Sequence, residues 1–222
     1  MLASLRWLFL VGVCLLPLAL AAKPLVLEGL TFSDELGGVE LIDGWGRGTL
    51  DDPFVLVEQI TGVGPATLIV RGTTWRIGNR IGSHHEVGFA VTKVVRNGTE
   101  VAWPIFDMEL REFQDSSSPF GDGLSFGQAT EAGKPFQSDH YRQNQDVDEP
   151  YDGVSFFDGV VEPGGQATFR FVITDTTPKY EFYLLQRRDS PLALGPPTAR
   201  LADLARRPRG DARLCTREPG AC

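Results

Sequence analysis

One stretch of the sequence, Gly123-Leu-Ser125-Phe-Gly127, matches a catalytic motif. In hydrolases a G-x-S-x-G motif holds the serine hydroxyl exposed on a sharp turn between a strand and a helix. Here the preceding residues, 114–122, have the composition of a loop, and His140 is the only histidine downstream that could act as a base. A serine hydrolase is therefore an alternative only, and it requires Ser125 and His140 to lie within hydrogen-bond reach.

The histidines suggest metal binding only weakly. His84 and His85 are adjacent and precede Glu86, while His140 follows Asp139. Adjacent residues of a strand point to opposite faces, so two neighbouring histidines rarely bind one ion. The H-E-x-x-H spacing of zinc proteases is absent. We expect these histidines to lie in exposed loops.

The acidic residues are densest at Asp146, Asp148 and Asp152, with Asp158 close behind. Several carboxylate and carbonyl oxygens on a flexible loop are what calcium prefers. The spacing is not that of an EF-hand, because Pro150 occupies what would be the third ligand position. The cluster therefore predicts either a calcium site formed by these aspartates or a solvated acidic loop.

Three tryptophans, Trp45, Trp75 and Trp103, are candidates for stacking on a sugar ring. Large aromatic side chains also fill the cores of β-sandwiches, and the sequence does not separate the two roles. A binding role for these residues would make the chain a carbohydrate-binding module.

The elements that must position these residues are short strands. Short apolar runs alternate with Gly, Pro, Asp and Asn, which is typical of an all-β protein. The strand candidates are 54–60, 66–71, 87–96, 99–112, 167–174 and 180–186. The pair Asn97-Gly98 predicts a tight hairpin between the third and fourth of them.

Alternation along two of these strands predicts one buried face and one wet face. In the first, the apolar residues are Phe106, Met108 and Leu110, and they alternate with Asp107, Glu109 and Arg111. In the second, the apolar residues are Ala167, Phe169, Phe171 and Ile173, and they alternate with residues 168, 170, 172 and 174. Strands with a single apolar face must pack against a second sheet. We therefore expect an antiparallel β-sandwich, of jelly-roll or immunoglobulin-like type, with a closed barrel as the alternative.

The first residues, 1–21, have the composition of a secretory signal peptide. Arg6 precedes an apolar run over 7–16, and Ala19-Leu-Ala21 provides small residues for a peptidase site. The run is shorter than the roughly 20 residues of a membrane-spanning helix, so cleavage is preferred over an uncleaved anchor. The sequence thus predicts an exported protein, periplasmic or secreted, without a membrane span after signal cleavage.

Charge and composition divide the rest into a domain, 22–188, and a tail, 189–222. Residues 23–186 contain 12 Lys and Arg against 25 Asp and Glu, which argues against nucleic-acid binding. The tail is rich in Arg and Pro, and we expect it to be disordered. Cys215 and Cys222 lie within it and could pair in an oxidising compartment.

Three stretches, 97–110, 121–126 and 161–186, together resemble the exported β-sandwich domains of bacterial surface proteins of the PEP-CTERM type. The first includes Asn97, Thr99 and Trp103 in an N-x-T-x-x-x-W pattern, followed by an alternating strand. The resemblance implies a β-sandwich without catalytic residues. The apolar sorting helix of that family is absent from the tail after Gln186.

These observations predict an exported, non-enzymatic β-sandwich with a structural or binding role in the cell envelope or extracellular matrix. No cofactor is implied with certainty, and calcium is the one candidate. A polysaccharide or an envelope protein is the expected kind of partner. The alternatives are the carbohydrate-binding module and the serine hydrolase.

Overall fold

The computed structural model describes residues 24–127, 135–147 and 150–188. The predicted signal peptide (1–21), the Arg-rich tail (189–222) with its two cysteines, and Asp148 lie outside these residues. Among the residues described, no helix has the length and apolar character needed to cross a membrane.

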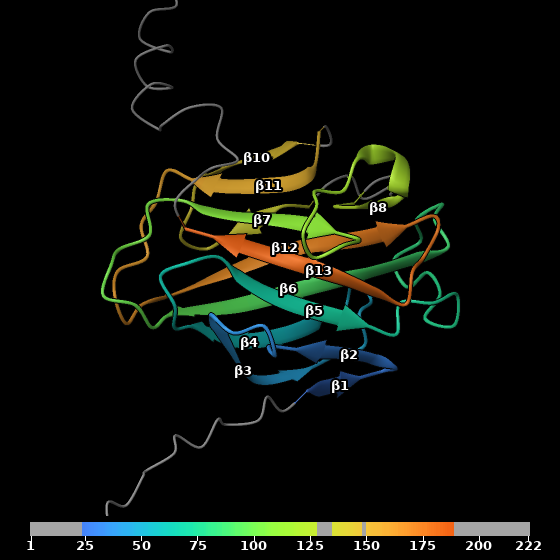
Figure 1. Ribbon diagram of the computed structural model, residues 1–222, viewed down its shortest axis with the longest axis horizontal. Coiled ribbons are helices and arrows are strands. Elements are labelled where there is room, and N and C mark those ends of the chain that lie inside the picture. Colours follow the sequence, from blue (N-terminus) through green and yellow to red (C-terminus); the bar gives the residue numbers. More distant parts are fainter. Residues whose placement is uncertain (1–23, 128–134, 148–149, 189–222) are drawn as a thin grey trace, which may run out of the picture.

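The described strands form two sheets (Figure 1). The first sheet has, in spatial order, β1 (Leu25–Leu27), β2 (Leu30–Ser33), β5 (Ala66–Arg71), β13 (Glu181–Arg187), β7 (Phe106–Arg111), β11 (Asp152–Phe157) and β10 (Gln143–Val147). The second has β3 (Val39–Trp45), β4 (Phe54–Ile60), β6 (Val87–Asn97), β12 (Gln166–Asp175) and β8 (Leu124–Ser125), with β9 (Gln137–Ser138) also pairing with β12. A short 3-10 turn, η1 (Phe120–Asp122), precedes β8.

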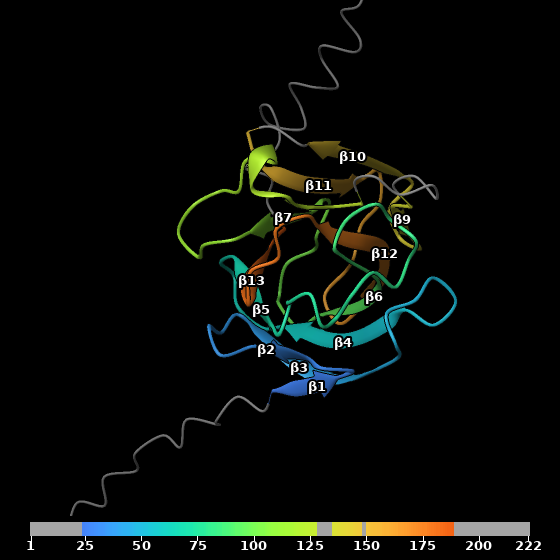
Figure 2. The same cartoon turned by 90° about the vertical axis from the view of Figure 1, so that its right-hand side faces the viewer.

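The two sheets pack face to face as a sandwich, seen from its end in Figure 2. The core between them contains aromatic side chains from both sheets, such as Phe106 and Phe169, whose ring centroids lie 4.6 Å apart. The sheets do not close into a barrel. The predicted β-sandwich is therefore confirmed, with one exception to its antiparallel pairing, because β4 and β6 run parallel.

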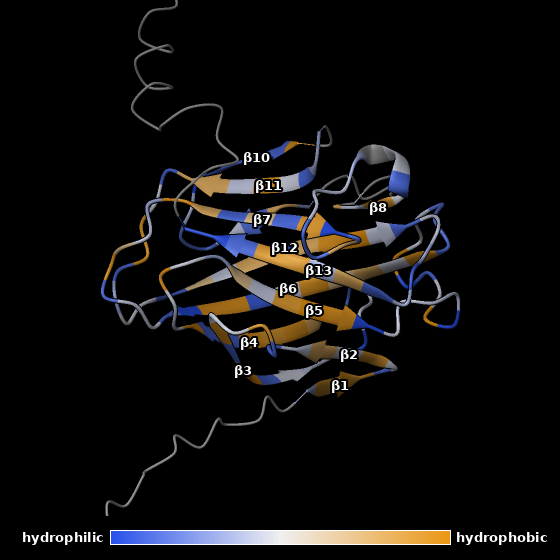
Figure 3. Ribbon diagram, in the orientation of Figure 1, coloured by the Kyte–Doolittle hydropathy of each residue, from blue (hydrophilic) through white to orange (hydrophobic). Residues whose placement is uncertain are grey.

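Alternating residues place the apolar side chains in this core. Phe106, Met108 and Leu110 on β7 are fully buried there, as are Ala167 and Phe169 on β12. The edge strand β10 is mostly hydrophilic, whereas β4, β5 and the opposite edge strand β1 are hydrophobic (Figure 3). The first four residues of β10 are exposed. A polar edge discourages pairing with another chain.

The opposite face of β7 is not wet, contrary to the prediction. Asp107 and Glu109 have no exposed surface. Each carboxylate oxygen of Glu109 lies 2.7 Å from a guanidinium nitrogen, one of Arg111 and one of Arg187. Burial acts to raise the pKa of Glu109, but these arginines and the Ser117 hydroxyl outweigh it, so the pKa is lowered. The sequence pattern could not show this because Arg187 comes from β13, far along the chain.

The predicted hairpin at Asn97-Gly98 is also wrong. The strand before it, β6, lies in the second sheet and pairs with β4 and β12, whereas β7 lies in the first sheet between β13 and β11. The intervening segment crosses the sandwich and buries Trp103 on the way. β4 and β5 are likewise in different sheets, although the two strands have the predicted bounds.

Candidate functional site

The structure does not bring Ser125 and His140 together. Ser125 is buried and pairs with Thr174 on β12, whereas Asp139, the neighbour of His140, donates its amide hydrogen to the carbonyl of Thr168. Those two positions on β12 are six residues apart, or about 20 Å along a strand. Leu124 and Ser125 of the G-x-S-x-G segment thus form a short strand, β8, that is buried although it ends the order of its sheet.

The predicted metal ligands form no cluster in the described part of the chain. There, no three His, Cys, Asp or Glu side chains are placed to hold one ion. Asp146 is exposed on β10, and Asp152 is buried at the start of β11. Burial and the neighbouring His84 lower the pKa of His85, which favours the neutral imidazole.

The three tryptophans differ in exposure. Trp103 is 1% exposed in the core, where its Nε1 donates to the Thr99 hydroxyl at 3.2 Å, so it is not available to stack on a ligand. Trp45, at the end of the edge strand β3, is 51% exposed. Trp75, in the loop between β5 and β6, is 73% exposed and lines a pocket.

The pocket, called the Trp75 pocket below, has a volume of about 580 Å³ and opens to solvent. It lies at the end of the sandwich where three connections meet: β1 to β2, β5 to β6, and β12 to β13 (the right-hand end in Figure 1). Its lining residues are Glu28, Gly29, Gly72, Thr74, Trp75, Arg76, Ile77, Pro178 and Tyr180.

Two glycines allow these connections to approach each other closely. Gly29 and Gly72 have φ values of 93° and 90°, which residues with a side chain rarely adopt. A Cβ atom at Gly72 would lie only 2.4 Å from the carbonyl oxygen of Gly29. The backbone there therefore has room only for glycine.

Hydrogen bonds hold the two larger loops of the pocket together. The Gly72 amide donates to the Tyr180 carbonyl at 2.8 Å, and the Thr73 hydroxyl donates to the Lys179 carbonyl at 2.6 Å. Thr73 is buried, so this contact is shielded from water. The positions of Trp75 and Tyr180 are thus fixed relative to each other by the backbone that carries them.

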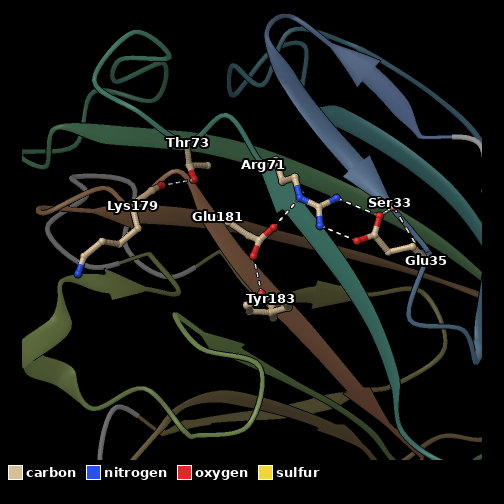
Figure 4. A network of polar contacts seen from close by, with 7 residues as sticks. All are labelled: Ser33, Glu35, Arg71, Thr73, Lys179, Glu181 and Tyr183. Carbon is tan, nitrogen blue, oxygen red and sulfur yellow. Dashed lines mark hydrogen bonds and ion pairs between the residues drawn. The ribbon is translucent and has the colours of Figure 1, made fainter.

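Arg71, which precedes the lining residue Gly72 in sequence, joins three segments in one polar network (Figure 4). Its guanidinium lies 2.6 Å from Glu35, after β2, and 2.5 Å from Glu181 on β13. Glu181 also accepts a hydrogen bond from the Tyr183 hydroxyl. The hydrogen bond from Arg71 is the main cause that lowers the pKa of Glu35. Since Arg71 and Glu181 are next in sequence to Gly72 and Tyr180, the network joins the two strands that lead to these lining residues.

The exposed rim of the pocket combines aromatic and charged groups. Tyr180 is 65% exposed, and the Arg76 guanidinium lies 5.6 Å from the centre of the Trp75 ring. Glu28 and Thr74 are the other lining residues with polar side chains. Two exposed aromatic faces beside hydrogen-bonding groups can bind a ligand with one apolar and one polar side.

A second, smaller depression of about 220 Å³ lies beside β9 and is lined by Gln137, Ser138, Asp139, Thr168 and Arg170. Asp139 lines it and lies 2.9 Å from Nδ1 of His140. Burial acts to raise the pKa of Asp139, but hydrogen bonds from Thr168 and His140 outweigh it, so the pKa is lowered. The lining contains no aromatic ring, so the depression lacks a stacking surface.

Sequence reasoning found Trp75 but missed Glu28, Arg76 and Tyr180. Trp75 is a sequence candidate together with Trp45 and Trp103, and the exposure of its side chain in the structure separates it from the buried Trp103. Glu28 and Tyr180 are distant in sequence, and only the pairing of β2, β5 and β13 brings them beside it.

Comparison with known proteins gives no family for the chain. No protein-family model matches it, and a search of curated proteins finds no match.

Proposed function

We propose that this chain is an exported, non-enzymatic β-sandwich protein of the cell envelope or extracellular matrix that binds carbohydrate in the Trp75 pocket. The observation that carries the proposal is that Trp75 and Tyr180, both largely exposed, line the same pocket. The secretory character of residues 1–21 and the resemblance to PEP-CTERM-type domains support the location outside the cytoplasm.

The chemistry of the pocket supports a sugar over other ligands. A sugar ring presents C–H groups on its faces and hydroxyls at its edges, so it can stack on an aromatic ring while bonding to polar side chains. Glu28 and Arg76 bring opposite charges to the rim, which gives the pocket no strong preference for a charged ligand. The volume lies within the usual range for small-ligand sites, about 300–1,000 Å³.

The carboxylates around the pocket support binding without catalysis. Glycoside hydrolysis generally uses two carboxyl groups about 5–9.5 Å apart across the scissile bond. Among the residues that line the pocket, Glu28 is the one carboxylate. Ser125, on β8, and Asp139, next to His140, contact positions of β12 that are six residues apart, so the alternative catalytic pair is separated.

Affinity electrophoresis of the purified, exported protein through gels containing single soluble polysaccharides tests the proposal. At least one polysaccharide should retard the wild-type protein, and Trp75→Ala and Tyr180→Ala should each abolish the retardation. Trp45→Ala is the matched control, because Trp45 is exposed but does not line the pocket. Equal retardation of the Trp75→Ala and wild-type proteins would refute the assignment of the site.

Absence of retardation in every neutral, acidic and amino-sugar polysaccharide would refute carbohydrate binding altogether. The remaining proposal would then be a structural role in the envelope or matrix that requires no ligand.

A further inference from the structure

The core of the sandwich contains a lysine and a glutamate in contact. Nζ of Lys93, on β6, lies 2.9 Å from Oε1 of Glu58, on β4, and neither side chain has any exposed surface. Both point inward, because Lys93 lies between the core residues Val91 and Val95 on one face of β6, and Glu58 lies between the core residues Leu56 and Ile60 on β4. Neither group has another hydrogen-bond partner among the residues described.

Such a pair is costly as an ion pair. A buried ion pair compensates for its lost hydration only when further hydrogen bonds satisfy the remaining oxygens and protons. Here the neighbours across the sheet are apolar: Lys93 pairs with Leu56 on one side and Phe169 on the other. Burial is the main influence on Lys93 and lowers its pKa, which favours the uncharged amine.

We propose that Lys93 and Glu58 condense to an intramolecular amide that covalently joins β6 to β4. A proton first passes from the Lys93 ammonium to the Glu58 carboxylate, which leaves a neutral amine beside a neutral carboxylic acid. Nζ then attacks Cδ, the Nζ–Cδ bond forms, and one Cδ–O bond breaks. The departing oxygen takes the transferred proton and one proton from the nitrogen, and leaves as water. No oxidant, metal or co-reactant is consumed.

The fold supplies the conditions for this step. In the parallel pairing of β4 with β6, Lys93 lies opposite Leu56 and Glu58 lies two residues further along β4, so the two side chains share one face and meet along a fixed diagonal. Holding two reacting groups about 3 Å apart replaces a collision in solution by an intramolecular step with a very high effective concentration. The dry surroundings disfavour the charged starting pair and do not supply the water that would reverse the reaction.

The bond would compensate for the lack of disulfides in the domain. The chain has three cysteines, at positions 14, 215 and 222, and none lies between residues 22 and 188. A covalent link between two adjacent strands of the second sheet would hold that sheet together in an oxidising or proteolytic environment. This inference is independent of the carbohydrate site.

Intact mass spectrometry of the denatured wild-type protein tests the proposal directly. The expected mass is that of the sequence, from its observed first residue, less one water molecule. After trypsin digestion, peptide 48–71, which contains Glu58, should remain linked to peptide 81–96, which contains Lys93 and stays uncut there. The Glu112–Lys179 pair is the internal control: it lies 3.4 Å apart, but the Lys179 side chain is 57% exposed, and trypsin should cut normally after Lys179.

Lys93→Met and Glu58→Leu should each restore the full sequence mass and separate the two peptides. If these variants do not fold, the wild-type mass and peptide map still decide the matter. A wild-type protein with the full sequence mass overturns the proposal. A loss of one ammonia molecule also overturns it, because that would identify an amide side chain, such as the buried Gln186, as the acyl donor.

Discussion

The side-chain oxygen of Asn97 accepts two hydrogen bonds from Thr99, one from its amide at 3.0 Å and one from its hydroxyl at 2.7 Å. The side-chain nitrogen of Asn97 donates to the carbonyls of Val101 and Val161, at 2.9 and 3.0 Å. This network directs the chain from β6 out of one sheet toward β7 in the other. Asn97 is 1% exposed, so its side chain is committed to the fold and is not accessible for glycosylation.

Asn97→Ala should therefore destabilise the protein by about 2–4 kcal/mol, because it leaves several buried polar groups without partners. Urea denaturation followed by far-ultraviolet circular dichroism measures this loss. Asn144→Ala is the control, since Asn144 is exposed and makes one 3.3 Å hydrogen bond to the carbonyl of Phe136. The control should change stability by less than about 0.5 kcal/mol. Equal denaturation midpoints for both variants would contradict a stabilising role for the network.

The sequence predicts where the strands of this fold begin and end better than it predicts which strands pair with each other. The bounds of β4 and β5 agree with the prediction because the apolar runs and turn residues that set them are local. The pairing of β6 with β4 and β12, however, depends on which apolar faces can be buried together across long separations. An Asn-Gly pair favours a two-residue hairpin, but here burial of Trp103 and the bonds to Val161 are incompatible with one.

The same distinction applies to the candidate site. The sequence names Trp75 only as one of three tryptophans that could bind or fill the core, and Tyr180 joins it only because β13 pairs with β5. The network of Arg71, Glu35 and Glu181 depends on the same long-range pairing, so nothing in the local sequence indicates it. Alternation along β7 predicts that Asp107 and Glu109 are exposed, but both are buried. The reason is again non-local, because β13 places Arg187 opposite Asp107 and in an ion pair with Glu109.

Tryptophan fluorescence of the protein without residues 1–21 should report two environments. A variant with Trp45→Phe and Trp75→Phe keeps Trp103 alone, which is 1% exposed, so its emission should be blue-shifted and poorly quenched by acrylamide. Trp103→Phe keeps the two exposed rings, so its emission should be red-shifted and strongly quenched. Efficient quenching in the first variant would show that Trp103 is reached by solvent and would contradict its place in the core.

Trp103→Ala and Trp75→Ala should differ sharply in stability. Removing the buried Trp103 ring leaves a cavity beside Phe106, whose ring centroid lies 5.8 Å away, and should cost about 3–5 kcal/mol. Trp75→Ala removes an exposed ring and should change the free energy of unfolding by less than about 0.5 kcal/mol. Guanidinium denaturation measures both. A large loss for Trp75→Ala would mean that the residue supports the fold and would weaken its assignment to ligand binding.

Asp175, at the end of β12, should make the protein less stable as the pH rises. Burial is the main cause that raises the pKa of Asp175 to about 6, and the nearby carboxylates of Glu112 and Asp122 add to it. An acid whose pKa is raised by folding stabilises the protein while protonated, below its ordinary pKa of about 3.8. That contribution is lost as the pH rises through the folded-state pKa, so the loss falls between about pH 4 and pH 7.

Asp175→Asn should remove this loss. The amide stays neutral, and its oxygen can still accept the 2.8 Å hydrogen bond from the Thr177 amide. The variant should therefore be more stable than the wild type at pH 7.5 by about 1–3 kcal/mol and nearly equal to it at about pH 4. Asp139→Asn is the contrasting control: hydrogen bonds lower the pKa of Asp139, so its replacement should destabilise the protein at pH 7.5. Thermal denaturation at the two pH values compares all three proteins. A constant difference between wild type and Asp175→Asn across this pH range would show that Asp175 does not titrate there, and that its carboxylate is ionised in the folded protein throughout.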